Sequence, residues 1–266
     1  MADLRGIRRR IGSIRNVRKL SDAMKMVSTA KFWKYQTSLD KARAFTDELE
    51  VMLSHAALHV PKKEVTKTID LVLTSDRGMC GAFNHVLLRS VSPSSPRYVI
   101  GKKGNDFFRS EGSCLERDTS FWDDFTSSSI NNLYSKLLKL AAENNCDGIA
   151  VNYMAFSSFV SQKPSKMLIY PCYPDAPAGF HEVDIEPNPA AFFEEAIHLY
   201  GKALLKQVIF ENLVSENAAR MGAMDNASRN AGELIEKLKI KYNRLRQDAI
   251  TVELMEIIGG TEALNE

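Results

Sequence analysis

The chain has 266 residues, of which 44% are hydrophobic and 26% charged, and its net charge is +2. This composition is typical of a folded protein with a substantial core and excludes a mainly disordered chain. No run of 18 or more apolar residues is present, and the opening MADLRGIRRR lacks an apolar centre. We therefore expect neither a membrane-spanning helix nor a secretory signal.

The first 43 residues are strongly basic. They contain twelve lysines and arginines against three aspartates, a net charge of +9, whereas the rest of the chain is net negative. Such a segment suits an acidic protein surface, a nucleic acid or an anionic lipid surface. A helix face exposed to solvent explains it equally well, so the charge pattern leaves these readings open.

Residues 1–60 are predicted to form one long coiled-coil helix. Their apolar residues recur at spacings of three and four, and no proline occurs before Pro61. A helix of this length spans roughly 75–100 Å at about 1.5 Å per residue. The expected seam has one phase break and comprises Leu4, Ile7, Ile11, Ile14, Val17, Leu20, Met24 and Val27, then Ala42, Phe45, Leu49, Met52 and Leu53.

Residues 61–186 are predicted to form a central α/β domain. Short apolar runs predict strands at 69–74, 98–100, 148–153 and 166–170, and helical patterns lie at 82–90, 103–111 and 129–144. This alternation of strands and helices predicts a small Rossmann-like domain with a mostly parallel sheet.

Residues 187–266 are predicted to form the second long helix, which begins near Pro187 and Pro189 and stops at Gly259 and Gly260. Its middle is rich in alanine, glycine and serine, which permits close approach by another helix. Since neither long helix can bury its stripe alone, we expect an antiparallel coiled coil of the two. The expected stripe is Leu205, Ile209, Leu213, Met221, Met224, Ala227, Ala231, Leu234, Leu238, Leu245, Val252 and Met255.

The segment SDRGMCGAFN, residues 75–84, follows a predicted strand and precedes a predicted helix, where α/β domains often bind phosphate. It contains neither GxGxxG nor GxxxxGK[ST], and it has no lysine. We therefore expect a tight turn at Gly78 and Gly81 rather than a nucleotide site. No HExxH motif or closely spaced cysteine pair is present either, so the sequence predicts no catalytic residue, no cofactor and no metal.

Three segments carry a family resemblance. LRGIRRRIGSIRNVRKLSDAMKMVSTAK at 4–31, SDRGMCGAFN at 75–84 and SENAARMGAMDNASRNAGELIEKLKIKYNRLRQDAITVELMEIIGG at 215–260 resemble the γ subunits of F-type ATP synthases. The resemblance implies a non-catalytic central-stalk rotor that turns inside the α3β3 hexamer. It would couple proton or other ion flow through the membrane c-ring to ATP synthesis on the β subunits. Without it, a nucleic-acid adaptor or a small-molecule enzyme using residues 78–81 would remain as alternatives.

The resemblance also implies contact residues and partners. Met24, Lys25, Arg220 and Gln247 would face the β subunits, and Glu186 would face the c-ring. Seam packing explains Met24 equally well, and a solvated position is the alternative for Arg220. The implied partners are the α and β subunits, an ε-type or δ-type central-stalk subunit and the c-ring, with no nucleic acid and no direct small-molecule substrate.

Two departures from the family limit what carries over. The stretch at about 90–135 is short and weakly similar, so a trimmed sheet is expected there, and no dithiol pair indicates redox control. The implied location is peripheral, on the ATP-producing face of an energy-converting membrane. The absence of an evident transit peptide favours the cytoplasmic side of a bacterial plasma membrane, with the matrix side of the mitochondrial inner membrane as the alternative.

Overall fold

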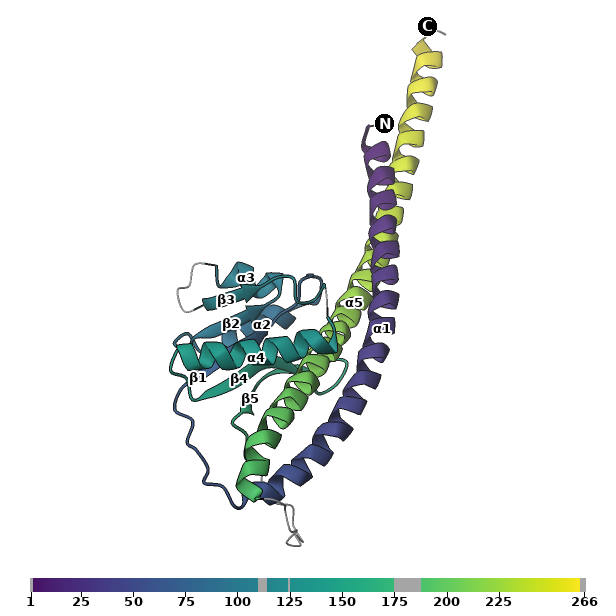
Figure 1. The fold of residues 1–266 in the computed structure, drawn as a ribbon. Helices are drawn as coiled ribbons and strands as arrows, with labels where there is room; N and C mark the ends of the chain where they lie inside the picture. Colours follow the sequence, from purple (N-terminus) through teal and green to yellow (C-terminus); the bar gives the residue numbers. More distant parts are fainter. Residues whose placement is uncertain (1, 110–113, 124, 175–187, 264–266) are drawn as a thin grey trace. The chain divides into compact units, whose positions relative to one another are not determined.

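The computed structural model describes residues 2–109, 114–123, 125–174 and 188–263, which belong to two compact units. We call residues Ser28–Arg220 the sheet unit, and Met1–Val27 together with Met221–Glu266 the coil unit. Two long helices, α1 (Ala2–Ala57) and α5 (Pro189–Ala263), contribute to both units (Figure 1). Each unit is described by itself below.

The sheet unit contains five strands in the order β3-β2-β1-β4-β5. The strands β1, β2, β3 and β4 are parallel to one another, and β5 pairs antiparallel with β4 at the edge. This confirms the predicted α/β fold with a mostly parallel sheet. The elements between the long helices are β1 (Thr68–Leu73), α2 (Phe83–Ser90), β2 (Arg97–Ile100), α3 (Lys102–Phe107), β3 (Cys114–Asp118), α4 (Ser127–Glu143), β4 (Gly148–Phe156) and β5 (Gln162–Tyr170).

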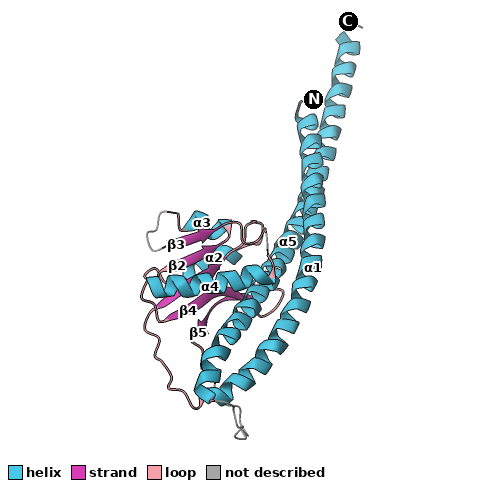
Figure 2. Cartoon of the chain, in the orientation of Figure 1, coloured by secondary structure: helices cyan, strands magenta, loops and turns pink. Residues whose placement is uncertain are grey.

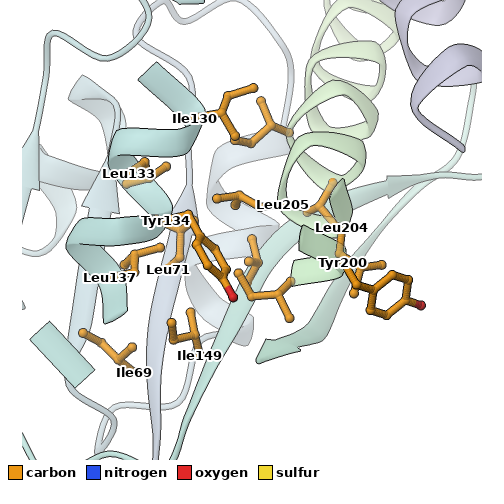
Figure 3. Close-up of a cluster of buried hydrophobic side chains, with 14 of the residues drawn as sticks. Ile69, Leu71, Ile130, Leu133, Tyr134, Leu137, Ile149, Tyr200, Leu204 and Leu205 are labelled. Atoms are coloured by element: carbon orange, nitrogen blue, oxygen red, sulfur yellow. The ribbon is translucent and has the colours of Figure 1, made fainter. Parts of the chain in front are cut away.

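Helices lie on both sides of this sheet (Figure 2). Because side chains alternate along a strand, Leu71 and Leu73 face one layer and Val72 faces the other. The larger cluster joins the sheet to α4 and α5 and to the end of α1. Figure 3 shows part of it, with Ile130, Leu133, Tyr134 and Leu137 from α4 opposite Ile69, Leu71 and Ile149, and with Tyr200, Leu204 and Leu205 from α5. The smaller cluster packs α2 against Val72, Val99 and Met154.

Within 90–135, where a trimmed sheet is expected, the described residues still form two strands of the sheet. This stretch contains β2, α3, the edge strand β3 and the beginning of α4. The sequence analysis missed β3 because its residues, CLERD, alternate between half-buried and exposed positions. An edge strand with only one partner strand needs no apolar run, and its charged residues protect the edge from pairing with another chain.

In the coil unit, α1 and α5 pack antiparallel. Ile7 and Ile11 form a buried cluster with Ile235 and Leu238, and Lys25 reaches Asp225. Later residues of α1 therefore lie beside earlier residues of α5, so the two helices run in opposite directions. This confirms the predicted coiled coil.

The seam of α1 differs from the predicted one. Val17, Leu20 and Val27 are 54%, 59% and 57% exposed, whereas Ser21 and Ser28 are buried. A series of α1 positions that are buried or half-buried, apart from the exposed Arg18, recurs at alternating spacings of four and three residues, so the phase break is wrong. Small polar side chains occupy this part of the seam, and a hydrophobicity pattern does not detect such positions. The seam positions are 7, 11, 14, 18, 21, 25, 28, 32, 35, 39, 42, 46, 49, 53 and 56.

Further expectations for the long helices are wrong. Phe45 and Met52 on α1 and Leu234 on α5 are exposed, and the neighbouring Ile235 is buried in place of Leu234. The stop at Gly259 and Gly260 is also wrong, since α5 continues to Ala263. Glycine within a helix weakens it by about 1 kcal/mol relative to alanine but does not by itself end it.

Candidate functional site

The predicted contact residues lie in different units. Met24 and Lys25 on α1 are half-buried in the coil unit, and Gln247 on α5 is exposed in the same unit. Arg220 is the last residue of the sheet unit. Glu186 lies outside the described residues. The structure therefore brings together only Met24 and Lys25, which are neighbours in the sequence.

Lys25 belongs to an ion cluster between the two helices of the coil unit. Its Nζ donates to Asp225 Oδ1 at 2.6 Å, and the second carboxylate oxygen of Asp225 lies 3.2 Å from an Arg229 nitrogen. The hydrogen bond and positive charge of Lys25, helped by Arg229, lower the pKa of Asp225. The ammonium of Lys25 thus helps to fix the pairing of α1 with α5, a role that the sequence did not predict.

Arg220 is buried, so the solvated position left open by the sequence is excluded. One of its terminal nitrogens donates to Glu216 Oε1 at 2.7 Å and to the backbone carbonyl of Arg77 at 3.1 Å. Its Nε donates to the carbonyl of Gly78 at 3.4 Å. Arg220 therefore ties α5 to residues 77 and 78 of the SDRGMCGAFN segment.

Glu216 balances the charge of Arg220 from one helical turn away. The side chains of Glu216 and Arg220 are only 12% and 10% exposed. Burial raises the pKa of Glu216, the charges of Arg220 and Lys31 oppose this shift, and the charge of Asp76 adds to it. The pair is therefore a buried ion pair in which the arginine offsets part of the desolvation of the carboxylate.

The SDRGMCGAFN segment is a tight, internally hydrogen-bonded turn. Asn84 Nδ2 donates to Ser75 Oγ at 2.8 Å, and the backbone N–H of Ser75 donates back to Asn84 Oδ1 at 3.0 Å. Met79 and Gly81 have positive φ angles of 63° and 60°, and the side chain of Met79 is 55% exposed. Because its polar groups bind one another and Arg220, the segment acts as a clasp on α5.

A polar cavity of about 170 Å³ lies beside this clasp. It is at the carboxyl end of β1, where doubly wound domains usually bind ligands, and Trp122 closes one side by donating from Nε1 to the Thr74 carbonyl at 2.9 Å. Four α5 side chains form another wall, so the helix fills much of this crevice. The cavity is lined by Lys31, Tyr35, Asp76, Arg77, Trp122, Asp123, Phe125, Leu213, Glu216, Asn217 and Arg220.

Among the residues that the structure describes, no three His, Cys, Asp or Glu side chains are grouped where they could hold a metal ion. In the same part of the chain, no helix has the length and apolar character needed to cross a membrane.

Glu216, Asp225 and Arg229 were not predicted from the sequence. Two signals for them were present, because Glu216 with Arg220 and Asp225 with Arg229 have the i,i+4 spacing of helical ion pairs. The bonds from Arg220 to residues 77 and 78 had no such signal, since they join positions more than 140 residues apart.

Comparisons with known proteins agree along almost the whole chain. A family model described as ATP synthase matches residues 3–264. The chain is 34% identical over 286 residues to the ATP synthase gamma chain of Halothermothrix orenii, covering 99% of this chain and 100% of that one. It is 35% identical over 283 residues to the ATP synthase gamma chain of Symbiobacterium thermophilum, covering 98% of each.

Solved structures show the same fold. A chain of the Euglena gracilis mitochondrial ATP synthase, in a structure of OSCP, F1 and c-ring in rotational state 3, has a TM-score of 0.73 and 20% identity. The match covers 99% of this chain and 95% of that chain. A rotor chain from the same organism has a TM-score of 0.66 and 18% identity, covering 94% and 99%.

Proposed function

We propose, since this chain belongs to the γ-chain family of ATP synthases, that it turns inside the hexamer of α and β subunits and couples ion flow through the c-ring to ATP synthesis. The chain is a central-stalk subunit of an F-type ATP synthase and thus a peripheral part of a membrane-bound complex. In this proposal it is not catalytic, and ATP is made on the β subunits.

The observation that carries the proposal is the exposed apolar end of α5. Ile7, near the beginning of α1, packs in the same cluster as Tyr242 and Leu245, so α5 continues beyond the start of α1 within the coil unit (Figure 1). Apolar side chains remain exposed on this last stretch, among them Ile250, Val252, Leu254 and Met255. Such an exposed apolar surface is typical of a helix that a partner protein covers with apolar residues of its own.

Charge supports the same arrangement. The first turns of α1 expose a cluster of arginines, comprising Arg5, Arg8, Arg9, Arg10 and Arg15. These side chains suit an acidic lining around the shaft. Because the shaft is asymmetric, each angle would favour a different conformation of the surrounding β subunits and give them unequal nucleotide affinities.

The finer assignments are part of the proposal. The direct partners are the α and β subunits, an ε-type or δ-type central-stalk subunit and the c-ring. Met24, Lys25, Arg220 and Gln247 contact the β subunits, and Glu186 contacts the c-ring. We infer the cytoplasmic side of a bacterial plasma membrane, with the matrix side of the mitochondrial inner membrane as the alternative.

Purification of the native complex tests the proposal. An affinity-tagged chain, extracted in mild detergent, is expected to bring down a hexameric ATPase and membrane subunits in a fixed ratio. A chain that remains a stable monomer without these partners, under conditions that preserve other membrane complexes, would contradict it.

Gln247→Ala is expected to slow ATP synthesis by the assembled complex about tenfold or more, because a hydrogen bond to a charged partner contributes about 1.5–3 kcal/mol. The isolated chain should unfold at the wild-type denaturant concentration, since the Gln247 side chain is exposed. Lys139→Ala, at an exposed position on α4, is the control. Equal rates for the two variants would remove Gln247 from the contact set.

Glu186→Lys is expected to weaken rotor assembly or coupling while the isolated subunit still folds, because the new ammonium would repel basic loops of the c-ring. Proton pumping by reconstituted vesicles measures the coupling. Unchanged pumping efficiency would count against a c-ring contact at this position.

A further inference from the structure

Arg220 already has a carboxylate partner within its own chain. Its guanidinium is bound by Glu216 and by the carbonyls of residues 77 and 78, and both ionic side chains are about nine-tenths buried. An acidic group of a partner subunit that attracts Arg220 must therefore compete with Glu216. The energetics of that exchange depend on what happens to the carboxylate that Arg220 leaves.

We propose that Glu216 is a positioning residue for Arg220, holding its guanidinium on the 75–84 turn and taking up a proton when Arg220 transfers to a carboxylate of a partner subunit. This inference rests on the proposed contact between Arg220 and the β subunit. It adds a role for Glu216, which would not touch the partner itself.

The surroundings of Glu216 disfavour a lone negative charge. Among the cations in the described part of the chain, only Arg220 makes a hydrogen bond to it, whereas Lys31 and Arg77 line the same cavity with exposed side chains. Burial already raises the pKa of Glu216 while Arg220 is in place, so departure of Arg220 raises it further. The titratable or charged groups around it are Arg220 on α5, Lys31 and Tyr35 on α1, Asp76, Arg77 and Cys80 in the turn, and Asp123 after β3.

The cavity supplies a route for the proton. Its volume of about 170 Å³ accommodates several water molecules, each of which occupies about 30 Å³ in the liquid. Asn217 also lines it, and the Oδ1 atom of Asn217 is buried without a hydrogen-bond partner among the described residues. A polar cavity with an unused acceptor is one that water enters. A proton taken from this water would neutralise the carboxylate without opening the fold.

Proton uptake during assembly tests the inference. The chain is mixed with the α and β subunits of its own complex in weakly buffered solution, and a pH indicator follows the protons taken up. Wild type is expected to take up about one proton more than Glu216→Gln, whose amide cannot titrate. Glu216→Asp keeps a carboxyl group and should restore the uptake. Glu236→Gln, which removes an exposed acid on the same helix, should behave as wild type.

The outcomes separate this inference from the proposed function. Equal uptake by wild type and Glu216→Gln, with Arg220→Gln folded but still impaired in ATP synthesis, overturns the role of Glu216 and leaves the Arg220 contact standing. Normal assembly and normal ATP synthesis with Arg220→Gln overturn the contact and the inference together. Circular dichroism of Glu216→Gln checks that lower proton uptake by this variant does not result from misfolding.

Discussion

Arg220→Met is expected to lower the free energy of unfolding by about 3–5 kcal/mol at neutral pH, because it leaves the buried carboxylate of Glu216 without its partner. Methionine retains most of the apolar stem of arginine but not the guanidinium, so the loss reports mainly the charge and the hydrogen bonds to residues 77 and 78. Urea denaturation of the purified chain, followed by circular dichroism, measures it.

The pH dependence gives this prediction a second readout. In Arg220→Met the folded-state pKa of Glu216 lies above its unfolded value, so the folded state binds the extra proton. The destabilisation is therefore complete above the folded pKa and is recovered as the pH falls through it. Glu216→Gln in the same chain should remove most of the cost at every pH.

Lys239→Met provides the matched control. Lys239 also pairs with a glutamate on α5, but the two side chains are 45% and 65% exposed. Solvent screening limits such a pair to about 1 kcal/mol or less. If Lys239→Met and Arg220→Met lowered the free energy of unfolding by similar amounts, burial of the Glu216–Arg220 pair would not be the cause of the loss.

Gly101→Ala is expected to lower the free energy of unfolding by about 2–6 kcal/mol, the sum of backbone strain and overpacking. Gly101 has φ 97° and ψ 149°, a region open almost only to glycine. A Cβ atom there would lie 2.2 Å from the backbone oxygen of Thr74, which cannot rotate away. Since Thr74 precedes the 75–84 turn, the clash would also displace the clasp on α5.

Gly81→Ala is the control for Gly101→Ala. Gly81 also has a positive φ, of 60°, but a Cβ atom there would meet nothing within 4 Å. Its substitution should cost only the left-handed backbone strain of about 1–2 kcal/mol. If both variants unfold at the same urea concentration, the close approach of Thr74 to Gly101 is not what stabilises this corner of the sheet.

The sequence predicted elements that have a strong period and missed those whose burial depends on a distant partner. The long helices and the four interior or apolar strands were visible as periodic patterns. The polar edge strand β3 was not visible in this way. Its backbone hydrogen bonds come from its one neighbour, β2, and its residues form no apolar run. In α1, the pattern selected Leu20 over Ser21, although Ser21 is the buried residue.

The candidate site was predictable to a similar degree. The resemblance selected Arg220 and Lys25 as contact residues, and both proved to have ionic partners inside the chain. The partner of Arg220 lies one turn away, within reach of a pattern rule. Asp225 lies 200 residues from Lys25, and a single sequence contains no information that pairs two such positions.

The alternating four- and three-residue spacing along α1 gives the coiled coil a handedness. A repeat of 3.5 residues winds two helices around each other in a left-handed sense. Twisting the two helices in one direction therefore tightens their supercoil, and twisting them in the opposite direction unwinds it. Synthesis and hydrolysis, which turn a rotor in opposite directions, would thus load the serine-containing middle of the seam differently.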